Sequence, residues 1–90
     1  MSRKSVEFTA KAWNDYTFWQ TTDQKTAKKI TQLIKVSLKE PFNGIGKPEP
    51  LKHKLSGAWS RRIDSKHRLV YEVSDDVLYI LSCRHHYSEK

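Results

Sequence analysis

The sequence has almost no cysteine and no long apolar segment, and both shortages exclude classes of protein. Cys83 is the single cysteine among 90 residues, so no internal disulfide can form, whereas small secreted domains normally need several. The longest apolar run, residues 77–81, is far shorter than the roughly 20 residues that span a bilayer, and the N-terminus lacks the apolar region of a signal peptide. We therefore expect a cytoplasmic protein without a membrane anchor.

The short length and the basic charge of the chain limit its architecture and its partners. A chain of 90 residues is too short for two independent cores, which predicts one domain over residues 1–90. A deep enclosed pocket is also unexpected at this size, so any active site should be an open surface. Lysine and arginine total 17 against 10 acidic residues, a net charge of +7. Such an excess attracts polyanions, and the expected partner is nucleic acid or an acidic protein.

Hydrophobic periodicity and turn residues predict an α+β domain with the element order βααβββ. Trp13, Tyr16 and Trp19 recur at helical spacing, which favours a core position for all three. Residues 41–50 hold all three prolines and form a loop that fixes Glu49 between two of them. The predicted elements are a strand at residues 5–9, a helix at 10–20, a helix from the N-cap candidates Thr22 and Asp23 to about Lys39, and strands at 58–63, 67–74 and 77–84. We expect the helices to pack on one face of an antiparallel sheet, with the other face free for a ligand.

Basic residues gather on the predicted second and third strands and on the loop before them. The guanidiniums of Arg61, Arg62 and Arg68 can each bind phosphate oxygens through a planar fork of N–H groups. Aromatic residues lie among them, and Trp59, Tyr71 and Tyr87 are candidates for stacking on unpaired bases. The candidate RNA-binding residues are Lys47, Lys52, His53, Lys54, Arg61, Arg62 and His85. A solvated basic surface without a nucleic-acid ligand explains the composition equally well.

Glu49, Arg68 and His86 are candidates for metal-free cleavage of RNA. The attacking 2′-hydroxyl must lose a proton, the phosphorane gathers negative charge, and the departing 5′-oxygen must gain a proton. A carboxylate, a guanidinium and an imidazole suit these three tasks. No cluster of histidine, cysteine and carboxylate residues has metal-ligand spacing, so we expect no metal site. The spacing of the trio is weak support by itself, because a histidine near a chain end is more often an ordinary surface residue.

Four motifs resemble the Txe/YoeB toxins, relatives of RelE in type II toxin–antitoxin systems. They are KPEPLKH at residues 47–53, LSGAWSRRI at 55–63, HRLVY at 67–71 and CRHHY at 83–87. The resemblance extends over nearly the whole chain. It implies a microbial-ribonuclease-like fold and a toxin that cleaves messenger RNA in the ribosomal A site without a cofactor. It also implies assembly as a homodimer and inhibition by a cognate antitoxin, for which we expect an acidic, partly disordered segment.

The resemblance also implies roles for individual residues. Glu49 of the KPEP motif corresponds to the general base, and Arg68 of HRLVY to the residue that stabilises charge on the phosphate. His86 and Tyr87 correspond to the general acid and to a residue that positions RNA. The sequence departs from the family pattern at His85, where a tyrosine is expected, and in continuing past Tyr87. The second imidazole leaves open which histidine transfers the proton.

The predicted hairpin at residues 75–76 gives a further test of the histidine assignment. In a two-residue turn Arg68 opposes Cys83, which puts Arg68 on the face of His85. A longer turn, or a bend near the chain end, puts His86 on that face instead. We retain His86 because the family motif ends in this His-Tyr pair.

Three functions are compatible with the sequence. The first is a ribosome-dependent endoribonuclease, and the second is a non-catalytic module that binds RNA or the ribosome through the same basic face. The third is a protein-interaction domain that only docks an acidic peptide. New RNA ends with a 2′,3′-cyclic or 3′-phosphate support the first function, whereas binding without new ends supports the second.

Overall fold

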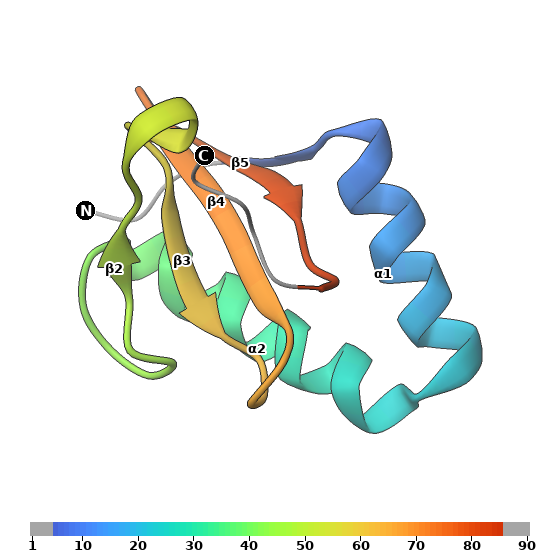
Figure 1. The fold of residues 1–90 in the computed structure, drawn as a ribbon. Helices are drawn as coiled ribbons and strands as arrows, with labels where there is room; N and C mark the ends of the chain where they lie inside the picture. The colour runs from blue at the N-terminus through green and yellow to red at the C-terminus, as the bar shows by residue number, and fades with distance from the viewer. Residues whose placement is uncertain (1–4, 86–90) are drawn as a thin grey trace.

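Residues 5–85, which the computed structural model describes, fold into two α-helices, a short 3-10 helix and five strands (Figure 1). In chain order the elements are β1 (Ser5–Phe8), α1 (Ala10–Thr22), α2 (Gln24–Lys39), β2 (Glu49–Pro50), η1 (His53–Leu55), β3 (Trp59–Arg62), β4 (Arg68–Ser74) and β5 (Val77–Ser82). This arrangement confirms the predicted α+β class and adds β2 and η1. Within the described part of the chain, neither long helix has the length and apolar character needed to cross a membrane.

The strands form one mixed sheet in the order β1-β5-β4-β3-β2. β3, β4 and β5 make the antiparallel meander that the sequence predicts. β1 pairs in parallel with β5, so the expectation of a wholly antiparallel sheet is wrong at this edge. Parallel neighbours need a long crossover, and the chain between β1 and β5 provides it. β2 forms the opposite edge, where a strand that contains proline is tolerated because no further strand needs its N–H group.

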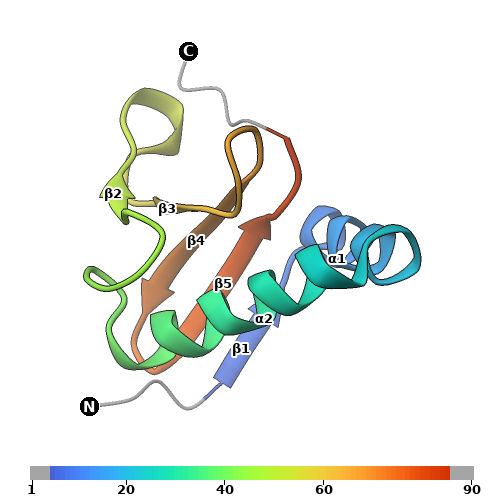
Figure 2. The same cartoon turned by 90° about the horizontal axis from the view of Figure 1, so that it is seen from below.

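α2 is an amphipathic helix with clear start and stop signals. The carboxylate of Asp23 accepts hydrogen bonds from the N–H and the hydroxyl of Thr26, which caps the helix as predicted. Pro41 follows shortly after the last helical residue and prevents continuation. The buried residues of α2 are Ala27, Ile30, Leu33, Ile34 and Ser37. Figure 2 shows α2 running along one face of the sheet with α1 beside it.

α1 places its aromatic residues in different environments. Thr9 caps the helix by accepting a hydrogen bond from the N–H of Ala12. Trp19 is buried and Tyr16 packs partly buried against the core, as the sequence predicts. Trp13 is 52% exposed, so its predicted core position is wrong. Residues spaced by three shift by about 60° around a helix at each step, which moves Trp13 away from the buried face.

Two apolar clusters lie on opposite faces of the sheet. The larger one joins both helices to alternate residues of the meander, including Leu69, Tyr71 and Ile80. The smaller one lies on the face away from the helices and consists of Leu51, Leu55, Ala58, Val70 and Leu81. The segment of β2 and η1 therefore covers part of the face that was expected to be free (Figure 1). On the same face, Arg62 and Arg68 lie beside the turn between β3 and β4.

The β4–β5 hairpin begins in the predicted register and then shifts. Its turn has the predicted two-residue length. An irregularity between Val70 and Tyr71 moves the pairing by one residue, so that Val70 pairs with Ser82. The predicted opposition of Arg68 and Cys83 is therefore wrong, because it assumes an uninterrupted ladder.

Candidate active site

Glu49, Arg62 and Arg68 lie on the sheet face that points away from the helices. On β3 and β4 alternate residues pack toward the helices, so the residues between them face the other way. Glu49 pairs with Ser60 across β2 and β3, and Arg62 pairs with Arg68 across β3 and β4. Residues paired across antiparallel strands share a face. The structure therefore brings together a carboxylate and two guanidiniums from three strands.

The spacing of the strands sets the size of this site. Neighbouring strands lie about 4.8 Å apart and alternate residues of one strand about 6.8 Å apart, so the Cα atoms of Glu49 and Arg68 are roughly 12 Å from one another. Glutamate and arginine side chains extend from both ends of this gap.

Arg68 is held at the start of β4 by the turn that precedes it. The residue is 8% exposed, and its Nη1 donates to the carbonyl oxygens of Asp64 at 2.8 Å and His67 at 3.1 Å. The Asp64 carboxylate accepts hydrogen bonds from the N–H groups of Lys66 and His67. Burial raises the pKa of Asp64, but these donors and the neighbouring positive charges outweigh it and leave the pKa below its ordinary value. The turn thus fixes the direction of the Arg68 guanidinium.

The segment that follows β5 is anchored beside α1. Trp19 Nε1 donates to the carbonyl oxygen of Cys83 at 2.8 Å, and the Asp15 carboxylate accepts a hydrogen bond from the N–H of Cys83 at 3.0 Å. Arg84 lies over the ring of Phe18, with 3.5 Å from Cζ to the ring centroid. These contacts direct the chain along α1 toward the start of β4.

Most of the predicted RNA-binding residues are exposed. They are Lys47, Lys52, His53, Lys54, Arg62 and His85. Three of them lie at or beside η1, close in the chain to Glu49, and so give this border of the site a positive charge. His86 and Tyr87, the predicted general acid and RNA-positioning residue, lie outside the described residues.

Arg61 differs from the expectation of a surface position. It is 0% exposed and lies on the helix side of the sheet, with its Cζ 5.6 Å from the ring centroid of Tyr71. Nη1 donates to the carbonyl oxygen of Ile45 at 2.7 Å, and Nη2 donates to those of Glu40 at 2.6 Å and Asn43 at 2.7 Å. A guanidinium bonded to three loop carbonyls stabilises the loop between α2 and β2, and its donors are turned away from any RNA on the opposite face.

The candidate stacking aromatics are also less available than the sequence suggests. Tyr71 is buried and donates its hydroxyl hydrogen to the carbonyl oxygen of Pro41 at 2.6 Å. Burial raises the pKa of this hydroxyl above its ordinary value. Trp59 is half-buried and contacts Phe42, with ring centroids 4.7 Å apart. The prediction that Tyr71 stacks on a base is therefore wrong, and Tyr87 lies outside the described residues.

Sequence reasoning missed the contributions of Asp15, Trp19 and His67 to the site. Asp15 and Trp19 bond to Cys83, which is 68 and 64 positions away in the chain. No local pattern reveals such distant partners, although His67 directly precedes the candidate arginine in the HRLVY motif. Within residues 5–85, no three histidine, cysteine or carboxylate residues are grouped so that they could hold a metal ion.

Comparison with protein families and known sequences identifies the relatives of the chain. The model of a family described as "YoeB-like toxin of bacterial type II toxin-antitoxin system" matches residues 8–87. The chain is 60% identical to toxin YoeB of Escherichia coli (strain K12) over 76 residues, which are 84% of this chain and 90% of the relative.

Solved structures agree with the sequence matches. The YoeB/ParE toxin from Agrobacterium tumefaciens is 46% identical with a TM-score of 0.92, and the alignment covers 93% of this chain and 100% of that one. YoeB from Staphylococcus aureus, 45% identical, has been solved as a dimer and in a heterotetrameric YoeB-YefM toxin-antitoxin complex, with TM-scores of 0.88 and 0.86. Both alignments cover 96% of this chain and 100% of the S. aureus chain. The predicted family and fold are confirmed, and the chain belongs to the YoeB-like toxins of bacterial type II toxin–antitoxin systems.

Proposed function

We propose that this toxin is a ribosome-dependent endoribonuclease that cleaves messenger RNA in the ribosomal A site and thereby inhibits translation. The observation that carries the proposal is the position of Glu49 and Arg68 on one sheet face, bordered by exposed basic residues. The net charge of +7 supports an RNA substrate, because it favours binding to phosphates. Membership of a toxin family supports translation as the target.

The proposed reaction is an internal transesterification of RNA. Glu49 accepts the proton of the 2′-hydroxyl, whose oxygen attacks the adjacent phosphorus. Arg68 stabilises the negative charge that gathers on the phosphorane oxygens. His86 gives a proton to the 5′-oxygen as the P–O5′ bond breaks, while Tyr87 positions the RNA. The products are a 2′,3′-cyclic phosphate and a free 5′-hydroxyl.

The proposed RNA contacts come from the exposed basic residues. Those assigned to phosphate binding are Lys47, Lys52, His53, Lys54, Arg62 and His85. Arg61 is left out because its guanidinium is bonded within the fold. Substitutions in this set should weaken binding and its salt dependence more than they change the rate of the bound complex.

Replacing Glu49 by glutamine tests the proposed base. Glu49→Gln keeps the shape of the side chain but cannot accept the proton, so cleavage should fall by at least about 10²-fold while ribosome binding stays near normal. Cleavage is measured by in vitro translation with purified toxin, followed by primer extension on the messenger. Glu72→Gln is a matched control, because Glu72 lies on the same face further along β4.

The same assay separates the proposal from its alternative. If the wild-type toxin binds ribosomes but produces no new messenger ends, the chain is a non-catalytic module that binds RNA or the ribosome. Equal losses of ribosome binding in Glu49→Gln and Arg68→Ala would also indicate a non-catalytic binding module.

The proposed chemistry uses no metal ion, since base, cation and acid are all side chains. Cleavage should therefore persist when chelation leaves only the tightly bound magnesium that keeps the ribosomal subunits joined. A strict additional requirement for zinc or manganese would contradict this part of the proposal.

The proposed protein partners are a cognate antitoxin and a second copy of the chain. The S. aureus relative forms a complex with YefM and has also been solved as a dimer. An acidic, partly disordered antitoxin segment suits the basic site face, so complex formation should weaken with salt and should stop cleavage on ribosomes. Analytical ultracentrifugation of the free toxin measures its oligomeric state.

A further inference from the structure

Both backbone polar groups of His85 are bonded to the start of β4. Its N–H donates to Nδ1 of His67 at 2.7 Å, and its carbonyl oxygen accepts a hydrogen bond from the N–H of Arg68 at 3.2 Å. His85 has a φ of 68°, in the left-handed region that residues other than glycine rarely adopt. Bonds to two consecutive residues therefore hold a bend that the chain would not favour by itself.

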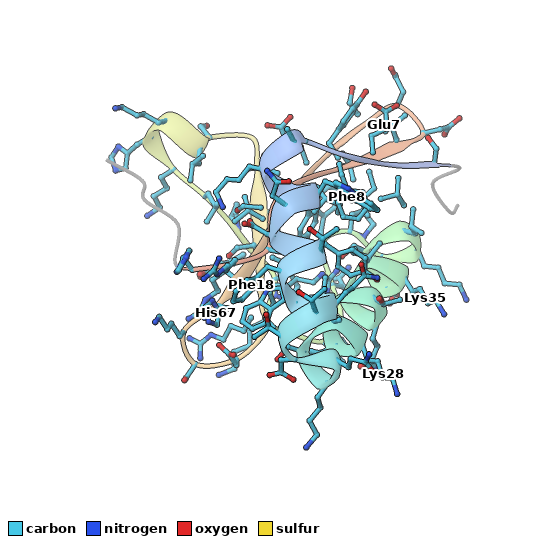
Figure 3. All side chains as sticks on the ribbon, turned by 90° about the vertical axis from the view of Figure 1, so that its right-hand side faces the viewer. Glu7, Phe8, Phe18, Lys28, Lys35 and His67 are labelled. Atoms are coloured by element: carbon cyan, nitrogen blue, oxygen red, sulfur yellow. The ribbon has the colours of Figure 1, made fainter. Side chains whose placement is uncertain are left out.

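The ring of His67 is in turn fixed by α1. It meets the indole of Trp19 edge to face, with ring centroids 4.8 Å apart and 81° between the planes. The same indole donates its N–H to the carbonyl oxygen of Cys83. Figure 3 shows the labelled His67 beside α1, near Phe18. The direction of the imidazole and the position of Cys83 are therefore both tied to α1 through Trp19.

The bond from His85 determines the proton positions on His67. A backbone N–H can only donate, so Nδ1 must offer a lone pair and the single ring proton must be on Nε2. A doubly protonated imidazole has a hydrogen on both nitrogens and cannot accept this bond. The anchor of His85 therefore exists only while His67 is neutral.

The surroundings of His67 favour this neutral form. Burial has the largest effect and lowers the pKa of His67. The negative charge of Asp64 raises this pKa, and the positive charges nearby lower it further. The net shift of the pKa is downward. The charged groups that act on the ring are Asp64 and Lys66 from its own turn, and Arg84 and His85 from the segment after β5. Arg68 on β4 follows His67 directly and donates Nη1 to the carbonyl oxygens of Asp64 and His67. On α1, Asp15 is paired with Lys11 and bonded to the N–H of Cys83.

We propose that His67 is a positioning residue: its neutral imidazole holds the backbone of His85, the residue that directly precedes His86, the proposed proton donor. This inference rests on the proposed function, because His67 acts on the reaction only through His86. The backbone N–H of Arg68 donates to the carbonyl oxygen of His85. The proposed cation, Arg68, is therefore hydrogen-bonded to the residue that precedes the proposed acid, His86. Protonation of His67 removes the acceptor of the His85 N–H and leaves the carbonyl bond to Arg68 as the remaining backbone anchor of His85.

Two substitutions separate the acceptor of His67 from its ring. His67→Asn keeps an oxygen acceptor near the place of Nδ1 and cannot be protonated, whereas His67→Phe keeps an aromatic ring against Trp19 but has no acceptor. In single-turnover cleavage on programmed ribosomes, His67→Phe should lower the maximal rate by about 10- to 100-fold, with the half-saturating toxin concentration nearly unchanged. His67→Asn should cleave at least about tenfold faster than His67→Phe, and it should lack the acid-side loss of rate that His67 protonation causes in the wild type.

Nuclear magnetic resonance tests the bond in the absence of RNA. We expect ¹⁵N shifts that assign the proton of neutral His67 to Nε2, and a His85 amide that is protected from hydrogen exchange. The protection should disappear as His67 titrates, should be absent in His67→Phe, and should persist at low pH in His67→Asn. A neutral His67 that carries its proton on Nδ1 would overturn the inference.

The activity outcomes distinguish this inference from the proposed function. If both variants are folded by thermal melting and cleave as fast as the wild type, the positioning role is wrong and the proposed function stands. If the wild-type toxin does not cleave messenger on ribosomes, the proposed function is wrong, and the catalytic role of His67 is wrong with it.

Discussion

Replacing Arg61 by methionine tests how the loop between α2 and β2 is held. Methionine has a similar length but no charge and no donor, so Arg61→Met removes the three hydrogen bonds to the loop carbonyls while it keeps most of the buried volume. These carbonyl oxygens belong to the segment that leads to Glu49. The variant should therefore lose stability, and its site should lose activity as a consequence.

The size of the loss follows from the number of bonds. Each intramolecular hydrogen bond contributes about 1 to 1.5 kcal/mol net, so three bonds contribute roughly 3 to 4.5 kcal/mol. Part of this is offset because a charged group need no longer be buried, and Arg61 Nε has no hydrogen-bond partner among the described residues. We expect a net loss of about 2 to 3 kcal/mol, which lowers the melting temperature of a 90-residue domain by about 10 to 20 °C.

The assay is thermal unfolding followed by circular dichroism, with two comparison variants. Arg62→Met is the matched control, because Arg62 is the next residue of β3, is exposed and faces the other side, so its melting temperature should stay within about 3 °C of the wild type. Arg61→Lys should be intermediate, since a compact ammonium cannot span three carbonyls as a planar fork does. An Arg61→Met protein that melts within about 3 °C of the wild type would refute the role given to Arg61.

Three further perturbations test other buried or capped groups. Burial raises the pKa of the Cys83 thiol to about 12 from an ordinary value of 9.0, so the native toxin should resist iodoacetamide by mass spectrometry at about pH 8. Because the unfolded thiol ionises first, the free energy of unfolding should also fall as the pH rises above about 9. The pKa of Asp64 is lowered in the fold, so its carboxylate stabilises the fold above about pH 4, and this contribution is lost as the pH falls further. In Asp64→Asn, the free energy of unfolding measured in urea should therefore depend less on pH below about 4. Asp23→Ala removes the cap of α2 and should lower the melting temperature by a few degrees, whereas an unchanged value would mean that solvent replaces the cap.

Local chemical signals predicted the helices and the meander well. Asp23 and Pro41 define where α2 begins and ends, and both act through their own backbone neighbours. The hairpin turn at residues 75–76 is likewise a short-range feature. The parallel pairing of β1 with β5 joins distant parts of the chain, and no local signal in either strand specifies the direction of its partner.

The two adjacent arginines show where the sequence was informative but misread. Alternation along β3 puts Arg61 on the side of Trp59 and Ile63, which are core residues, and Arg62 on the side of Ser60. A strict use of this pattern separates a buried arginine from an exposed one. Composition alone counts both as phosphate ligands, because it ignores the side of the sheet. The pattern does not predict the three carbonyl oxygens whose hydrogen bonds offset the free-energy cost of burying the Arg61 guanidinium.

The shift of register near the end of β5 explains why the histidine assignment needed more than strand counting. An irregular pairing at Val70 changes which residues of the two strands share a face. No residue type in β5 predicts this irregularity. The resemblance to the family favoured His86 independently of this register. Only the opposition of Arg68 and Cys83 depends on an unbroken ladder, and the choice between His85 and His86 stays a prediction.

The groups proposed for catalysis are held mainly by polar anchors and only in part by apolar packing. The loop before Glu49 is bonded to Arg61, the Arg68 guanidinium is bonded to its own turn, and the chain leading to His86 is bonded to α1 and His67. Hydrogen bonds are directional, so they fix positions more narrowly than apolar contacts, and each is individually weak at about 1 kcal/mol net. A partner that binds with nanomolar affinity gains about 12 kcal/mol, which exceeds the sum of the few bonds that hold residues 83–85. We therefore expect an inhibitory partner to draw residues 83–85 away as well as to cover the sheet face.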